Sequence, residues 1–128
     1  MTALFQKLNL KAQNPILISS SPTSFKGELD SVGMTTPVHT TAVSDEKYKF
    51  TLTFVVSQTE LIAQAPILLK QTTPDAILWF AYPKQTSKAY ESDLNRDICR
   101  EMLETFGLES NRQVAIDDDW SALRFKKV

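Results

Sequence analysis

Residues 76–82, with the sequence AILWFAY, constrain the fold of this chain more than any other feature. Every side chain in this run is apolar or aromatic, whereas a strand with one face in water alternates apolar and polar residues. The run therefore predicts a strand buried on both faces, in the middle of a sheet that helices cover on each side. It is also the longest apolar stretch, and it is far shorter than the roughly 20 residues that a membrane span requires.

Shorter apolar runs and longer amphipathic stretches alternate along the rest of the chain, which is the pattern of an α/β domain. We expect further strands at residues 16–18, 37–43, 50–56, 113–116 and 120–126. We expect helices near residues 2–8, 22–33, 57–69 and 92–106. Strands joined through helices run parallel, so the prediction is a mostly parallel central sheet flanked by helices, with the last two strands as a C-terminal antiparallel hairpin.

Local signals mark several helix ends and leave one connection open. Ser57 and Glu60 form a capping box at the start of a helix. Pro66 lacks the N–H that an inner turn needs, so it predicts a kink or a split in that helix. Gly33 and Gly107 are each predicted to end a helix in the left-handed conformation. Residues 44–48 are too short for a helical crossover, so the second and third strands either pair antiparallel or are joined by an extended loop.

Composition limits the classes of protein to consider. A chain of 128 residues corresponds to a single domain, residues 1–128, and its 42% hydrophobic and 23% charged residues exclude a disordered class. The formal net charge of −1 argues against a nucleic acid or an anionic membrane as partner. One cysteine, Cys99, rules out an internal disulfide and a cysteine-built zinc site. The polar N-terminus does not match a signal peptide, so we expect a cytoplasmic protein.

Motifs for a cofactor, a metal or a nucleophile are missing. With only three glycines, the chain has no G-x-G-x-x-G and no phosphate-binding lysine loop, so no cofactor is predicted. Residues 19–24 are rich in hydroxyls, which favours a capped helix start over an anion site. The acidic run 117–119 matches no calcium loop, so no metal is predicted. Cys99 falls on an apolar helix stripe and His39 has no nucleophile near it, so no catalytic residues are predicted.

Polar side chains follow the predicted central strand, and open α/β sheets bind ligands beyond the carboxyl ends of such strands. Arg96 opens the last helix and could either clamp a carboxylate or phosphate or be neutralised by Asp97. An indole and a guanidinium in the C-terminal hairpin could line a pocket or an oligomer surface. The candidate ligand-binding residues are Lys84, Thr86, Ser87, Lys88, Asn95, Arg96, Asp97, Asp117, Trp120, Ser121 and Arg124.

Several of these tracts resemble a bacterial family of small uncharacterised proteins, known only as a domain of unknown function. The tracts are ILWFAYPK at 77–84, TSK at 86–88, NRD at 95–97, VAID at 114–117 and DWSALRF at 119–125. The resemblance covers essentially the whole chain and is strongest over 75–127. It implies a single small Rossmann-like α/β domain and no activity. Family members usually carry glycine where this chain has Gln85, so close backbone approach of a ligand there is not expected.

Three functional hypotheses follow. The leading one is a non-catalytic binding or interaction module, whose polar groove with Lys and Arg side chains takes a small anionic ligand or an acidic peptide. The first alternative is a transferase-like enzyme with a nucleotide-derived cofactor, which rests on fold analogy. The second alternative is a structural homodimer formed through the C-terminal hairpin. The polar groove of the leading hypothesis can form only if the loop after residue 82 lies beside the C-terminal hairpin.

Overall fold

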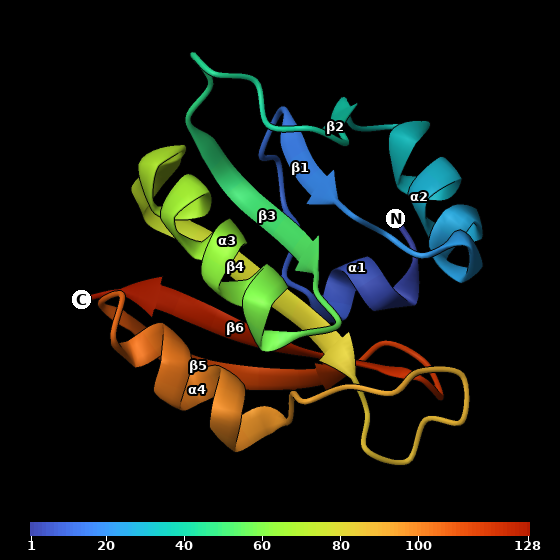
Figure 1. Ribbon diagram of the computed structural model, residues 1–128. Helices are drawn as coiled ribbons and strands as arrows, with labels where there is room; N and C mark the ends of the chain where they lie inside the picture. Colours follow the sequence, from blue (N-terminus) through green and yellow to red (C-terminus); the bar gives the residue numbers. More distant parts are fainter.

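A six-stranded sheet in the order β2-β1-β3-β4-β6-β5 forms the centre of the molecule (Figure 1). The computed structural model describes residues 1–128. Its strands are β1 (Ile16–Ser19), β2 (Val38–His39), β3 (Tyr48–Phe54), β4 (Thr72–Pro83), β5 (Leu108–Ala115) and β6 (Trp120–Lys127). The first four strands are parallel, and β6 is antiparallel to both of its neighbours, β4 and β5. Five strands therefore share one direction, which confirms the mostly parallel sheet and the antiparallel C-terminal pair.

The apolar run at 76–82 lies in β4, between β3 and β6, and all seven of its side chains are buried. The connection left open by the sequence is an extended loop, because β2 and β3 both pair with β1 in parallel. Strand β2 has only two residues instead of the predicted 37–43. After His39 the chain leaves the sheet edge and returns to the start of β3, so the threonine-rich remainder of the segment has no strand to pair with.

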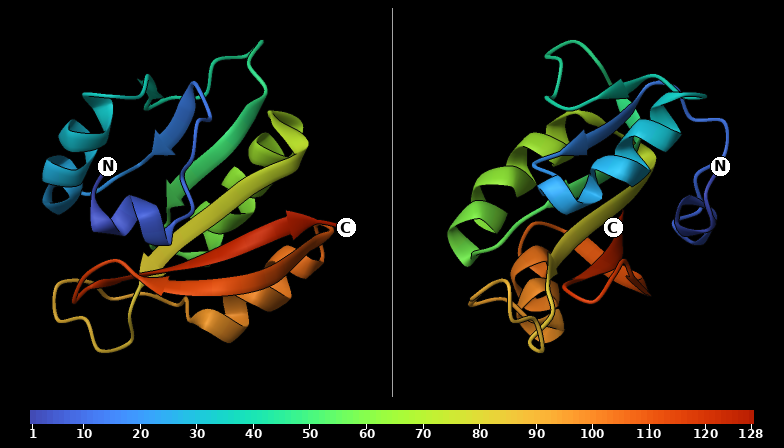
Figure 2. Two further views of the ribbon diagram at one scale, coloured as in Figure 1. Left: turned by 180° about the vertical axis from the view of Figure 1, so that it is seen from behind. Right: turned by 90° about the vertical axis from the view of Figure 1, so that its right-hand side faces the viewer.

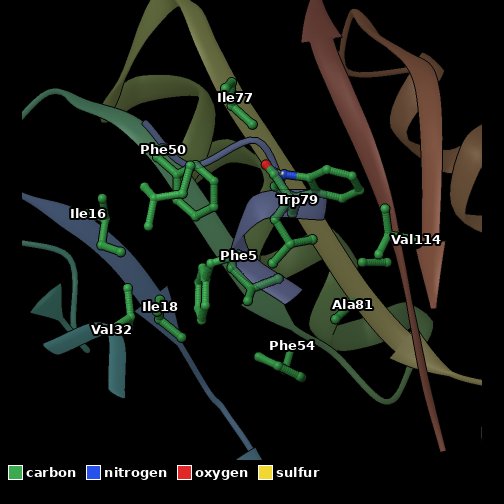
Figure 3. Packing of buried hydrophobic residues seen from close by; sticks show 14 of the residues in the cluster. Phe5, Ile16, Ile18, Val32, Phe50, Phe54, Ile77, Trp79, Ala81 and Val114 are labelled. Carbon is green, nitrogen blue, oxygen red and sulfur yellow. Dashed lines mark hydrogen bonds between the residues drawn. The ribbon is translucent and has the colours of Figure 1, made fainter. Parts of the chain in front are cut away.

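Helices cover both faces of the sheet (Figure 2). On one face α1 (Ala3–Lys7), the 3-10 turn η1 (Thr23–Phe25) and α2 (Lys26–Gly33) enclose a core that includes Phe5, Phe50 and Trp79 (Figure 3). On the other face α3 (Gln58–Lys70) and α4 (Arg96–Glu104) enclose a second core around Leu78, Phe80 and Cys99. The longest helix, α3, has 13 residues, and none of the helices is long and apolar enough to cross a membrane.

The capping signals were confirmed in part. The Ser57 hydroxyl accepts from the backbone N–H of Glu60 at 3.1 Å, as the capping box predicts. Pro66 does not split α3, which is continuous from Gln58 to Lys70. Pro66 and Ile62 are exposed, so the Ile62 carbonyl that loses its helical donor can bond to water.

The structure confirms the left-handed conformation at one of the two glycines that were predicted to end a helix. Gly107 takes the left-handed conformation, with φ of 77°. Gly33 instead ends α2 without positive φ, because the chain continues into the right-handed residue Met34. Helix α4 begins at Arg96, four residues later than predicted, since the Ser92 hydroxyl bonds to the Val56 carbonyl at 2.7 Å instead of capping a helix.

Candidate functional site

A groove of about 530 Å³ opens at the carboxyl end of β4, on the face of the sheet that carries α4. We call it the β4 groove. It is lined by Tyr82, Lys84, Gln85, Thr86, Asn95, Arg96, Gln113, Ala115 and Ser121. A cavity of about 370 Å³ adjoins it, shares four of these residues and adds Asp97. The volume of the β4 groove lies within the range of small-molecule sites, roughly 300 to 1,000 Å³.

Two hydrogen bonds hold the loop after β4 beside the turn between β5 and β6. The backbone N–H of Lys84 donates to the Asp119 carbonyl at 2.8 Å. The Ser87 hydroxyl donates to the Asp119 carboxylate at 2.8 Å. The predicted neighbourhood of this loop and the C-terminal hairpin is therefore present (Figure 1). Both segments contribute residues to the lining of the β4 groove.

Three strands supply the floor of the β4 groove. Tyr82 of β4 is opposite Ser121 of β6, which is opposite Ala115 of β5. The Gln113 amide nitrogen donates to the Ser121 hydroxyl at 3.0 Å and more weakly to the Tyr82 hydroxyl at 3.5 Å. Burial raises the pKa of Tyr82, against an opposing hydrogen bond from Ser121, so the phenol stays protonated and the floor is neutral at physiological pH.

The rim of the β4 groove carries two cationic side chains in different settings. The Arg96 Nε lies 3.6 Å from the Asp97 carboxylate, which Arg100 also approaches at 3.2 Å. Lys84 has no carboxylate partner within 4.0 Å. Because the Arg96 and Asp97 side chains are 58% and 61% exposed, their attraction is weak and screened, and Asp97 only partly offsets the positive rim.

The structure brings together about half of the residues predicted from the sequence. Those that line the β4 groove are Lys84, Thr86, Asn95, Arg96 and Ser121, and Asp97 lines the adjoining cavity. Ser87 and Asp117 brace the surrounding loops, because the Asp117 carboxylate accepts from the backbone N–H groups of Asp119 and Trp120. Lys88 is exposed on the loop and lines neither cavity.

Trp120 and Arg124 lie on the opposite face of the sheet from the groove. Side chains alternate along β6, so the face that carries Ser121 cannot also carry its even-numbered neighbours. Trp120 is 2% exposed and packs against Phe54 with a ring-centroid distance of 5.1 Å. Arg124 is opposite Trp79 in the register. The predicted convergence of Lys84, Arg96, Asp117 and Arg124 on one cavity is therefore not observed.

Four further residues line the same groove and were not among the candidates, namely Tyr82, Gln85, Gln113 and Ala115. Tyr82 belongs to the buried strand β4, and its position directly before the exit loop is the signal that could place its hydroxyl at the groove floor. Gln113 and Ala115 alternate with the buried Val114 along β5, which marks them as residues of the opposite face.

A second groove, of about 450 Å³, lies on the same face of the sheet beside β1. We call it the β1 groove. It is lined by Leu17, Ser19, Ser20, Thr40, Thr41, Ala42, Gln64, Ile67, Leu68 and Gln71. None of these side chains is charged. Residues 40–42 form the outer wall of the groove, and the next residue, Val43, is held by two hydrogen bonds. Its N–H donates to the Tyr48 hydroxyl at 3.1 Å, and its carbonyl accepts from the Gln71 side chain.

Polar groups mark the carboxyl end of β1, at one end of the β1 groove. The other end of the groove reaches Gln71, whose carbonyl accepts from the N–H of Tyr48 at the start of β3. Ser20 takes the left-handed conformation, with φ of 60°, which turns the chain out of the strand. The Ser19 and Thr53 hydroxyls bond to each other at 3.0 Å. Thr51, the register partner of Leu17, is fully buried and its hydroxyl has no partner. Thr51 does not line the β1 groove, so this buried hydroxyl is not one of the polar groups of the groove.

No protein-family model and no curated protein sequence matches this chain. Among solved structures, the DhpI–SAH complex superposes with a TM-score of 0.63 at 10% identity, over 98% of this chain and 82% of that one. The N-methyltransferase NodS from Bradyrhizobium japonicum WM9 has a TM-score of 0.61 at 12% identity, over 95% and 91%. The ribosomal protein L11 methylase from Lactobacillus delbrueckii subsp. bulgaricus has 0.59 at 9%, over 95% and 73%. These structures confirm the Rossmann-like fold.

The same structures correct two predictions. The non-catalytic binding module is not supported as the main interpretation, because similar structures are methyltransferases and favour the transferase alternative. The small anionic ligand is also wrong, since structures of this fold hold SAH, SAM or sinefungin, nucleotide-derived molecules that are not all anions. The homodimer through the C-terminal hairpin finds no support, because the Trp120 side chain is buried in the core and offers no contact surface.

Proposed function

We propose that this chain is a transferase of the S-adenosylmethionine-dependent methyltransferase type. The observation that carries the proposal is the likeness to DhpI and NodS, which extends over 95% or more of the chain. When bound, S-adenosylmethionine supplies a methyl group activated by a positively charged sulfur. The proposal includes the cytoplasmic location predicted from the sequence.

The β1 groove is the site that the topology favours for the nucleoside part of the cofactor. The chain leaves β1 for β2 on one side, through α2, whereas β3 leads to β4 on the other side, through α3. Open α/β sheets bind ligands outside the carboxyl ends of the strands at such a reversal of strand order. Ser19 and Ser20 end β1 at this point and line the β1 groove.

The residues of the β1 groove fit a neutral nucleoside. Leu17, Ala42 and Leu68 give an apolar surface for a heteroaromatic base. Hydroxyl and carboxamide groups can donate to and accept from ribose hydroxyls and ring nitrogens. Those groups belong to Ser19, Ser20, Thr40, Thr41, Gln64 and Gln71. The chain has no glycine loop, and Ser20 supplies the left-handed turn instead.

Isothermal titration with S-adenosylhomocysteine tests this proposal. Ile67 is 43% exposed and lines the β1 groove, so Ile67→Trp should fill the groove without disturbing the core. We expect the dissociation constant to rise by about tenfold or more, equivalent to at least about 1.4 kcal/mol.

The matched control is Ile62→Trp, on the same helix and 51% exposed but outside the groove, which should bind like the wild type. Wild-type protein that shows no binding at about 1 mM ligand, a free energy of only about 4 kcal/mol, would exclude the proposed function. Binding that both tryptophan variants leave unchanged would move the cofactor elsewhere and leave the function standing.

A further inference from the structure

We infer that the outer side of α3 is an interaction surface for a second copy of this chain, in which the two α3 helices pair antiparallel about a two-fold axis. The inference does not depend on the proposed function, because it rests on the side chains of one helix and on the charges at its two ends. We call this surface the α3 patch. Its members are all exposed residues of α3, namely Glu60, Ile62, Ala63, Pro66, Ile67 and Lys70.

The centre of the α3 patch is apolar, although it faces solvent. Ile62 and Ile67 are 51% and 43% exposed, and Ala63 and Pro66 between them are exposed as well. These four residues are mostly three or four positions apart, so their side chains are neighbours on the helix surface. Of the four, only Ile67 lines the β1 groove, so the patch borders that groove without including the rest of its lining.

The rest of α3 makes this exposed patch unusual. The inner side of the helix packs into the core and is apolar too. A helix that is apolar on both its inner and its outer side is normally buried on both, whereas a surface helix carries polar residues toward water. No other element of the chain lies over the outer side of α3 (Figure 1). A contiguous exposed apolar patch of this kind marks a site of protein association.

The two ends of the α3 patch carry opposite charges. Glu60 lies in the first turn of α3, and Lys70 lies in its last turn. Neither side chain has an oppositely charged group within 4.0 Å in the protein. Both charges are therefore free to pair with charges on a partner.

This pattern is complementary to itself when two copies pair antiparallel. If Ala63 of one copy faces Pro66 of the other, the isoleucines at 62 and 67 also face each other. The first turn of each helix, with Glu60, then lies beside Lys70 of the other copy, and the two-fold axis makes every such contact occur twice. Parallel pairing would instead bring Glu60 to Glu60 and Lys70 to Lys70. The charges therefore select the antiparallel arrangement.

The size of the α3 patch predicts a weak dimer. Helix α3 has 13 residues and is about 20 Å long. One pair of helix faces of this length is a small interface beside the roughly 1,200 to 2,000 Å² that stable complexes bury. The formal net charge of −1 adds little repulsion between two copies. We therefore expect a reversible dimer whose population depends on protein concentration.

Sedimentation equilibrium at protein concentrations from about 5 µM to about 1 mM tests the inference. The wild type should shift from monomer to dimer across this range. Glu60→Lys or Lys70→Glu places like charges at both ends of the interface, so each variant alone should dimerise about tenfold or more weakly. A mixture of the two variants restores opposite charges at both ends. The mixture should therefore dimerise like the wild type.

The matched control is Glu101→Lys, which makes the same charge change on the exposed side of α4 and should leave the dimer unchanged. Because Glu60 belongs to the capping box, a melting temperature shows that each variant is folded. Ala63→Glu, in the middle of α3 and away from both caps, should also prevent association. A wild type that stays monomeric at about 1 mM, single variants that dimerise as the wild type does, or folded variants whose mixture stays monomeric would overturn the inference.

Discussion

The indole of Trp79 shows how one buried polar atom ties two elements together. Trp79 is fully buried in β4, and its Nε1 donates to the Leu8 carbonyl at 2.8 Å (Figure 3). Leu8 is the C-terminal cap of α1 and is itself fully buried. The bond therefore fixes α1 on the sheet, and its loss leaves a buried carbonyl without a donor.

We expect Trp79→Phe to lower the free energy of unfolding by more than the loss of ring volume alone, with about 1–3 kcal/mol from the orphaned carbonyl. Trp120→Phe is the matched control, because the Trp120 Nε1 is buried without a partner and no hydrogen bond is lost. Urea unfolding of both variants measures the difference. Equal losses in the two variants would show that the Leu8 bond contributes nothing.

For individual residues, the sequence predicts which stretches of chain lie near the β4 groove better than it predicts which of their side chains line it. Lys84 follows the end of β4, while Asn95 caps α4 and Arg96 begins it, and all three line the β4 groove. Trp120 and Ser121 are neighbours in the sequence, and only the register with β4 decides which of them faces α4. The run 120–125 has no clear polar alternation, so its period could not assign the faces.

Among the elements, α3 has the clearest local determinants, and its capping residue can be tested directly. The Ser57 hydroxyl accepts from Glu60 N–H and also donates to the Glu60 carboxylate at 3.3 Å. Ser57→Ala should lower the free energy of unfolding by about 1 kcal/mol. Ser57→Thr retains the acceptor and should stay close to the wild type. Thermal unfolding distinguishes the two, and equal losses would mean that the cap adds no stability.

The elements that were placed less well depend on distant partners. Helix α4 begins at Arg96 because Ser92 and Asp93 bond to residues before and within α3, among them Gln58 at 2.9 Å. A capping pattern in the sequence does not reveal such a competing tertiary contact. Strand β2 is short because only β1 pairs with it, at the sheet edge. Local signals predict that an element exists, while its ends follow from tertiary contacts.

For the whole molecule, alkaline pH provides a test of how tightly the α3 and α4 face is packed. Burial raises the pKa of Cys99 from 9.0 to about 12. In the unfolded chain the Cys99 thiol ionises near pH 9.0, whereas in the folded chain it stays protonated up to about pH 12. Ionisation between these two values therefore favours the unfolded chain. The stability that the buried thiol contributes is intact below pH 9.0 and is lost as the pH rises toward about 12. The raised pKa of Tyr82 acts in the same direction, while the lowered pKa of Lys127 opposes it.

We therefore expect the free energy of unfolding to fall above pH 9.0, with up to about 1.4 kcal/mol per pH unit from Cys99. Urea unfolding at a series of pH values measures the slope. Cys99→Ala lowers stability at every pH, but it should flatten the slope because no thiol remains to ionise. An identical slope in both proteins would show that Cys99 is not sealed from solvent.

The fold class of the whole chain was predictable, because apolar runs and amphipathic stretches alternate and the run at 76–82 fits only an interior strand. The strand order was not, since β1 and β3 pair across more than 30 residues of intervening chain. The likeness to transferases could also not be predicted from the sequence as the main hypothesis. The similar structures are only 9–12% identical, and this chain lacks the glycine loop that would have signalled a cofactor.

The reversed strand β6 has a consequence for how the sheet assembles. It lies between β4 and β5, although β5 precedes it in the sequence. Until β6 is in place, β4 and β5 have no hydrogen-bonding partner between them, and Ser121 is missing from the floor of the β4 groove. Insertion of this one strand therefore both joins the two parts of the sheet and completes the groove.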